Sequence, residues 1–91
     1  MSQLQKLLLS VLSGQGDHSI GFTDLVKLIS RLGFDMRIKG SHHIFTLQGV
    51  EEIINLQPKG SRAKPYQVKQ VRELIVKHKL QLKGPDDEQQ I

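Results

Sequence analysis

The chain has 91 residues, no cysteine, and a net charge of +4 from 13 Lys and Arg against nine Asp and Glu. This length predicts one domain (1–91) whose core buries roughly 60–65% of the unfolded surface, and the missing cysteines exclude disulfides and thiolate metal sites. The N-terminal run QLQKLLLSVL is too short and too polar to span a bilayer and carries no secretory cleavage pattern. We therefore expect a cytoplasmic protein with no membrane partner.

Positive charge is concentrated in the second half of the chain. Between residues 59 and 83 the only acidic residue is Glu73. The cations of this stretch are Lys59, Arg62, Lys64, Lys69, Arg72, Lys77, Lys79 and Lys83. A half of the chain with this excess of positive charge is expected to attract a polyanion, and the attraction should weaken as the salt concentration rises. The alternative interpretation is a solvated helix face in which the charges cluster by chance.

The first predicted element is an amphipathic helix over 2–13, followed by a loop rich in Gly and Ser over 13–21. The next helix has the hydroxyl of Thr23 as its N-terminal cap and ends at Gly33. Its apolar residues recur at i, i+3, i+4 and i+7 and predict one buried stripe. They are Leu25, Leu28, Ile29 and Leu32.

After Gly33 the period of the apolar pattern changes from 3.6 to 2, which predicts strands. The first strand has Phe34, Met36 and Ile38 on its dry face. Two further strands are expected over 42–47 and 51–57. The tight turns at Gly40-Ser41 and Gln48-Gly49 predict an antiparallel meander.

The last predicted helix begins near Pro65, which suits a first helical turn. Its expected inner stripe consists of Val68, Val71, Leu74 and Ile75. The segment 83–91 is expected to be a frayed tail. The predicted fold is α+β: an α-β-β-β-α unit with a three-stranded antiparallel sheet, both helices on one face, and an additional N-terminal helix.

Two adjacent histidines follow the Gly40-Ser41 turn and should point to opposite faces of the sheet. His43 shares its face with Phe45, which the helices should cover, so a partly buried and hydrogen-bonded structural histidine is expected. His42 falls on the open face beside a cationic turn. On the pattern alone, the interpretation of His42 as an ordinary polar residue at a strand end is slightly favoured. His18 and His78 are expected at the surface.

The position of His42 suits general base catalysis. Histidine titrates near neutrality and can accept a proton from a weak acid such as a ribose 2′-hydroxyl. Arg37 and Lys39 lie close to His42 in sequence. Lys59 or Arg62 would join them if the fold brings the later part of the chain back to His42. Such cations can hold a scissile phosphate and offset its developing charge. No metal or cofactor is expected, because neighbouring strand residues diverge and no Cys or well-spaced carboxylate stands nearby.

Three segments together resemble the HicA toxins, small ribonucleases of bacterial toxin–antitoxin pairs. They are LVKLISRLGF (25–34), RIKGSHHIF (37–45) and VKQVRELIVKHKL (68–80), and the resemblance covers about residues 22–82. It implies a fold like that of double-stranded-RNA-binding domains, ribosome-independent cleavage of mRNA, and a HicB antitoxin that covers the active site. The family's catalytic histidine in the Gly-Ser-His motif matches His42. Some relatives carry it one place later, which makes His43 the second candidate.

The chain departs from the family pattern in three respects, one of which is the extra first helix (2–13). Many relatives have Pro-x-His after the third strand, where this chain reads Pro58-Lys59-Gly60. The Gly-Thr that usually opens the last helix is Tyr66-Gln67 here. The change at Pro58-Lys59-Gly60 leaves Lys59 or solvent to replace the second histidine if that histidine serves as general acid.

Two hypotheses follow for the function. The first is a metal-independent endoribonuclease toxin, monomeric by itself, that uses His42 as general base and takes mRNA as substrate and a HicB-like antitoxin as partner. Its phosphate-binding residues would be Arg37, Lys39, Lys59, Arg62 and Lys64. The alternative is a non-catalytic module of the same fold that binds double-stranded RNA by shape and by phosphate and 2′-hydroxyl contacts.

Overall fold

The computed structural model describes residues 2–83, so the predicted tail lies outside the described residues except for Lys83. The elements in chain order are α1 (Gln3–Ser13), η1 (Asp17–Ser19), α2 (Phe22–Arg31), β1 (Asp35–Lys39), β2 (His42–Leu47), β3 (Val50–Leu56) and α3 (Pro65–His78). Within the described part of the chain, no helix has the length and apolar character needed to cross a membrane.

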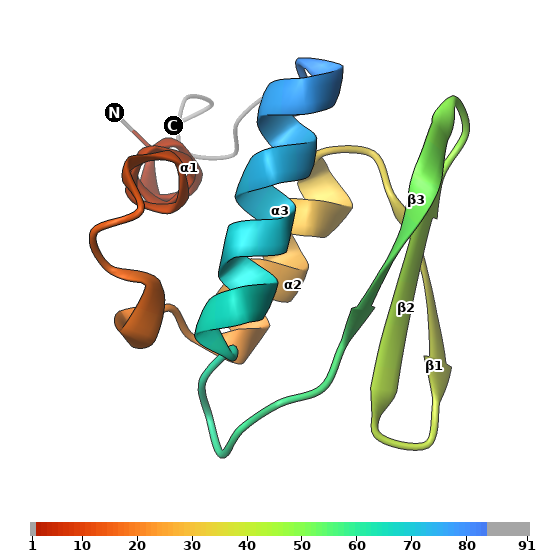
Figure 1. Ribbon diagram of the computed structural model, residues 1–91, viewed down its shortest axis with the longest axis horizontal. Helices are drawn as coiled ribbons and strands as arrows, with labels where there is room; N and C mark the ends of the chain where they lie inside the picture. The colour runs from red at the N-terminus through yellow and green to blue at the C-terminus, as the bar shows by residue number, and fades with distance from the viewer. Residues whose placement is uncertain (1, 84–91) are drawn as a thin grey trace.

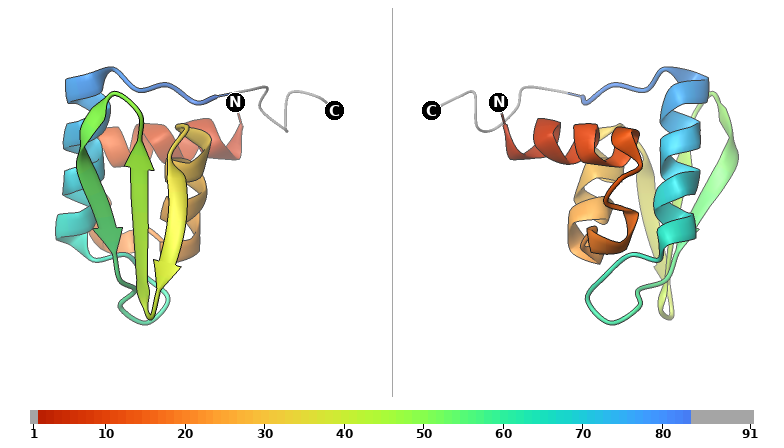
Figure 2. Two further views of the ribbon diagram at one scale, coloured as in Figure 1. Left: turned by 90° about the vertical axis from the view of Figure 1, so that its right-hand side faces the viewer. Right: turned by 60° about the vertical axis from the view of Figure 1, so that its left-hand side comes forward.

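The elements form three layers, which Figure 1 shows nearly edge-on. The antiparallel sheet has the strand order β1-β2-β3. α2 and α3 cover one face of the sheet, and α1 crosses these two helices on their far side (Figures 1 and 2). Within residues 2–83, no helix covers the other face of the sheet (Figure 2, left). The predicted α+β class and the α-β-β-β-α arrangement, similar to double-stranded-RNA-binding domains, are confirmed.

The core lies between the helix layer and the sheet. The predicted stripes of α2 and α3 are all buried, and they pack against residues from β2 and β3. The fully covered residues from the sheet include Phe45, Ile54 and Leu56. α1 adds Leu4 and Val11, so the additional helix contributes to the same core.

Arg72 of α3 joins the N-terminal segment to the rest of the molecule. Its Nη1 atom donates to both carboxylate oxygens of Asp17, at 3.0 and 3.2 Å, and to the main-chain oxygen of Val11 at 3.1 Å. Both charged side chains are mostly buried, with 20% of Arg72 and 17% of Asp17 exposed. Arg72 therefore has a structural role and is not available to a polyanion.

Glu52 of β3 forms a second link, between the sheet and α3. Its carboxylate accepts from Lys77 at 2.5 Å and from His78 at 2.9 Å. These two hydrogen bonds, the one from Lys77 first, lower the pKa of Glu52 to about 2, and Glu52 in turn raises the pKa of Lys77. His78 is thus a partly buried residue with a partner, whereas the sequence predicts a surface residue.

Two local predictions are wrong. The N-terminal cap of α2 is Gly21 rather than Thr23. The residues before the helix pair with the loop ahead of α3, through a bridge between Gly21 and Arg62 and a bond from Phe22 N to Ser61 O at 3.0 Å. This pairing makes the helix begin at Phe22.

The second error concerns the dry face of β1. Met36 is 41% exposed and Ile38 is 61% exposed, although both point to the helix side of the sheet. β1 is an edge strand with a neighbour on one side only. The alternating pattern identifies a strand correctly, but it does not tell an edge strand from a central one.

Candidate active site

His42 is the first residue of β2 and follows directly after the Gly40-Ser41 turn. Gly40 has a positive φ of 63°, a conformation that favours glycine and lets the hairpin close tightly. Lys39 and His42 are cross-strand partners, so their side chains share one face. His42 is exposed on the face that no helix covers.

His43 occupies the opposite face. Its ring meets Phe22 of α2 edge-on, with the ring centroids 4.9 Å apart and an angle of 79° between the planes. Its Nδ1 atom is buried and has no hydrogen-bond partner among residues 2–83, so the expectation of a hydrogen-bonded histidine is wrong for this atom. The structure places the two histidines on opposite faces, as strand alternation predicts.

Asn55 of β3 holds the His42 ring. The amide oxygen Oδ1 of Asn55 lies 3.0 Å from Nδ1 of His42. An amide oxygen can only accept a hydrogen bond, so Nδ1 carries the hydrogen and donates. In a neutral imidazole the other nitrogen, Nε2, then has its lone pair available as a base.

Gln57 holds the residue before the histidine in a similar way. Its Nε2 atom donates to the Ser41 hydroxyl at 3.0 Å. Asn55 and Gln57 are two residues apart along the chain at the end of β3 and therefore point to the same face. Two amide side chains thus tie the Gly-Ser-His segment to the neighbouring strand.

Neither amide is among the residues predicted from the sequence, although the strand pairing contains a signal for Asn55. With a two-residue turn at Gln48-Gly49, Leu47 pairs with Val50, and a regular continuation would place Asn55 opposite His42. In the structure the register shifts between Phe45 and Leu47, so Asn55 lies opposite Ile44 and reaches His42 along the diagonal. The signal in the sequence was thus a polar residue in the third strand, at the position that a regular register would pair with His42.

Two of the predicted phosphate-binding residues lie beside His42. Arg37 is the cross-strand partner of Ile44, and Lys39 is that of His42. Arg37, Lys39 and Ile44 line a shallow hollow of about 400 Å³ together with Ile38. The open face of the sheet therefore combines an imidazole with two permanent positive charges.

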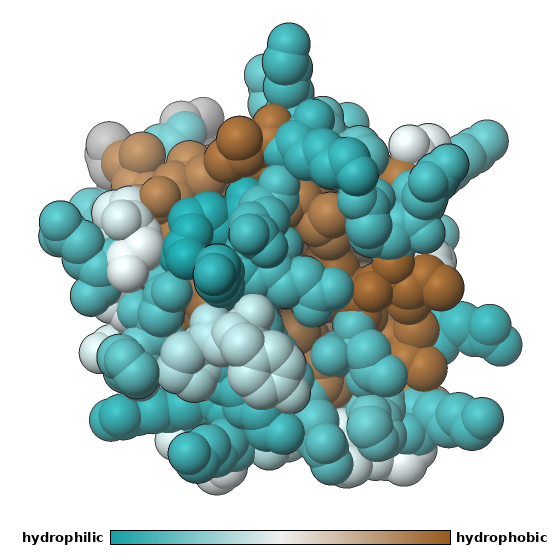
Figure 3. All heavy atoms as spheres, in the orientation of Figure 1, coloured by the Kyte–Doolittle hydropathy of each residue, from teal (hydrophilic) through white to brown (hydrophobic). Residues whose placement is uncertain are grey.

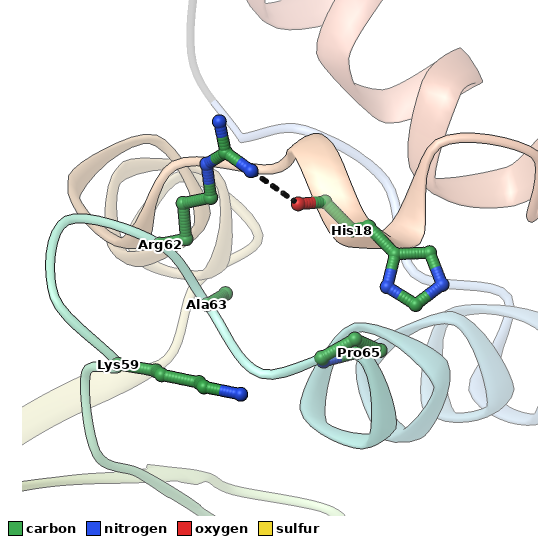
Figure 4. A pocket seen from close by; sticks show the side chains of 5 residues that line it. All are labelled: His18, Lys59, Arg62, Ala63 and Pro65. Atoms are coloured by element: carbon green, nitrogen blue, oxygen red, sulfur yellow. Dashed lines mark hydrogen bonds between the residues drawn. The ribbon is translucent and has the colours of Figure 1, made fainter.

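The other three predicted residues lie apart from that hollow, in the loop that leads to α3. Lys59 and Arg62 line a second pocket of about 250 Å³, together with His18, Ala63 and Pro65 (Figure 4). Lys64 is the N-terminal cap residue of α3, and its amino group lies 5.9 Å from the centre of the Tyr66 ring. The predicted set of five thus falls into two groups.

The open face also presents apolar surface. Ile53 is 58% exposed and Ile44 is half-buried. Figure 3 shows apolar atoms gathered over the sheet at the right of the molecule, between polar side chains. No group of three or more His, Asp or Glu side chains that could hold a metal ion occurs in the part of the chain that the structure describes.

Comparison with models of protein families identifies a family for this chain. The family model for the HicA toxin of bacterial toxin–antitoxin systems matches residues 22–78, which run from the first residue of α2 to the last residue of α3. Comparisons with curated proteins and with solved structures found no match. The matched region contains His42, Asn55, Lys59 and Arg62, whereas α1 and η1 precede it.

Proposed function

Because the chain belongs to the HicA toxin family of bacterial toxin–antitoxin systems, we propose that it is an endoribonuclease that cuts mRNA with His42 as the general base. The arrangement around His42 carries this proposal. His42 is exposed on the open face of the sheet, its Nδ1 atom donates a hydrogen bond to Oδ1 of Asn55, and Lys39 is its cross-strand partner. Asn55 therefore does not engage Nε2 of His42, which is the nitrogen that would act as the base, and this ring lies on the same face of the sheet as Lys39.

The proposed reaction uses the substrate's own 2′-hydroxyl as nucleophile. Nε2 of His42 takes the proton of this hydroxyl, and the 2′-oxygen forms a bond to the adjacent phosphorus. The bond from phosphorus to the 5′-oxygen breaks, and that oxygen takes a proton from water. The products are a 2′,3′-cyclic phosphate and a 5′-hydroxyl. Arg37 and Lys39 hold the non-bridging oxygens and offset the charge that develops on them.

The same face suits an antitoxin. Ile44 and Ile53 supply apolar contact area around which the polar residues of the site form a rim, as in many protein interfaces. A HicB-like partner that covers this face would bury His42 and exclude RNA. The free toxin is proposed to be a monomer with this face open.

The proposal is tested by the chemistry of the products. Purified protein is incubated in EDTA with an RNA oligonucleotide and with the same sequence carrying 2′-O-methyl groups throughout. We expect the RNA to be cut to fragments ending in 2′,3′-cyclic phosphate and the methylated strand to remain intact, because its nucleophile is blocked. Cleavage of both strands, or activity only with added metal, would contradict the mechanism. Intact RNA together with a salt-sensitive gel shift would favour the non-catalytic RNA-binding module.

A further inference from the structure

The second pocket combines two parts of the chain that are far apart in sequence. Lys59, Arg62, Ala63 and Pro65 come from the segment between β3 and α3, and His18 comes from η1. In Figure 4 the Lys59 amino group and the His18 ring lie on either side of Pro65. His18 precedes the region that matches the family, so part of this pocket belongs to the N-terminal extension of this chain.

The backbone around the pocket is held firmly. Lys59 and Arg62 exchange two main-chain hydrogen bonds, at 2.9 and 3.1 Å, across a turn in which Gly60 has a φ of 61°. Arg62 also bridges to Gly21, and Ala63 N donates to Ile20 O at 3.0 Å. The pocket walls are therefore in place before any ligand arrives, which lowers the entropic cost of binding.

The side chains give the pocket the chemistry of a phosphate site. Lys59 and Arg62 carry permanent positive charges, His18 adds a ring that can donate, and none of the lining residues is acidic. Nη1 of Arg62 donates to the His18 carbonyl oxygen at 3.5 Å, which links the extension to the loop and leaves other guanidinium donors for a ligand. Arginine and lysine are the usual partners of phosphate oxygens.

We infer that this pocket binds a backbone phosphate of the RNA at a distance from the cleaved bond, and that the N-terminal extension completes it through His18. This inference rests on the proposed function, which supplies RNA as the ligand. The segment between β3 and α3, which supplies most of the pocket residues, lies at the same end of the molecule as the turn between β1 and β2 (Figures 1 and 2). The Gln57–Ser41 bond ties the His42 turn to the start of the segment that forms the pocket. A strand crossing from one to the other would be held at two points.

The test measures binding rather than cleavage, with a fluorescent 2′-O-methyl RNA oligonucleotide that the proposed reaction cannot cut. Lys59→Ala and Arg62→Ala are each expected to weaken binding roughly tenfold, as for loss of a charged hydrogen bond. Each should also reduce the slope of log K against log salt by about 0.7, the value for one phosphate contact of a single strand. His18→Ala is expected to weaken binding by a smaller factor.

Lys27→Ala is the matched control, because it removes one exposed positive charge from α2, outside the pocket. It should leave both affinity and salt slope close to wild type. The inference is overturned if the pocket variants bind like Lys27→Ala, or if His18→Ala binds like wild type. Titration with inorganic phosphate tests whether the pocket is specific for phosphates of an RNA backbone. If free phosphate bound as tightly as the oligonucleotide, the pocket would not be a site for the RNA backbone. A protein that binds the oligonucleotide through this pocket but leaves RNA intact would support the pocket and refute the nuclease.

Discussion

At the scale of single residues, the two adjacent histidines show how position on a strand decides a chemical role. His42 and His43 have the same side chain, but His43 packs against Phe22 while His42 faces solvent and bonds to Asn55. The exposed residue keeps a free nitrogen, and the covered residue contributes to packing. The partner of His42 therefore defines the site as much as the histidine itself does.

Asn55 is expected to act through His42, by holding its ring in one orientation and one tautomer. Asn55→Leu keeps a similar volume but removes the acceptor, so the His42 ring is no longer held in one tautomer, and we expect cleavage to fall about tenfold or more. ¹⁵N NMR of the imidazole should show the Nδ1–H form in wild type and a mixture of tautomers in the variant. Thr46→Val, an exposed position further along β2, is the control.

Asn55→Asp provides a second test. If Asn55 only supported the fold, this substitution would not change the pH dependence of cleavage. A carboxylate accepts the same hydrogen bond but also stabilises the doubly protonated ring, which cannot act as a base. The pH below which cleavage is lost should therefore be higher in this variant than in wild type. An unchanged pH profile, together with wild-type tautomer signals in Asn55→Leu, would contradict a positioning role.

At the scale of elements, two polar links hold α3 to its neighbours. Arg72 joins α3 to the N-terminal segment, and Glu52 joins β3 to Lys77 and His78. Both links use cations that belong to the basic half of the chain. The basic character of α3 is therefore partly structural, and the proposed RNA binding would depend on the remaining cations.

Arg72→Ala should destabilise the protein. The substitution leaves the mostly buried carboxylate of Asp17 and the carbonyl of Val11 without this donor, which costs about 1–3 kcal/mol. Urea unfolding followed by circular dichroism measures the loss. Lys69→Ala, at an exposed position of the same helix, is the control and should change stability little. Equal effects of the two substitutions would show that Arg72 is not a link.

The Glu52 link should make stability depend on pH in the acid range. The pKa of Glu52 is lowered from 4.5 to about 2 in the folded protein, so the ionised group favours folding above about pH 4.5. This contribution fades as the pH falls from 4.5 towards 2. Thermal unfolding of wild type and Glu52→Gln should differ most near neutral pH and converge towards pH 2. A difference that stays constant over this range would contradict the assignment.

Most of the elements could be predicted from the sequence, because apolar periodicity and turn residues are local signals. The stripes of α2 and α3, the Gly40-Ser41 turn and the faces of His42 and His43 all follow from such signals. The errors at Thr23, Met36 and Ile38 arose from long-range pairing and from the strand order, which local patterns do not contain.

The same limit applies to the site. Charge composition predicted a basic surface, but it did not show that Arg72 and Lys77 are engaged by Asp17 and Glu52. It also did not separate Lys59 and Arg62 from Arg37 and Lys39, because the separation depends on how the loop before α3 packs against η1. Asn55 was missed because its contact with His42 depends on how β3 pairs with β2, and this pairing was not worked out from the sequence.

At the scale of the whole molecule, the two faces of the sheet have different surroundings. One face of the sheet builds the core, and the other exposes His42, two cations and isoleucine side chains. The N-terminal extension packs behind α2 and α3 and brings His18 to the second pocket. Under the proposed function, RNA and an antitoxin would compete for this open face.

If His42 is the base in RNA cleavage, His42→Ala should slow the cleavage step itself. Single-turnover rates on one RNA oligonucleotide are compared for wild type, His42→Ala and His43→Ala, after checking that all three are folded and bind the 2′-O-methyl oligonucleotide. We predict that His42→Ala is slower by about 10²–10⁴-fold, whereas folded His43→Ala retains most of its activity. Cleavage by His42→Ala at the wild-type rate, or loss of activity in folded His43→Ala alone, would contradict the account.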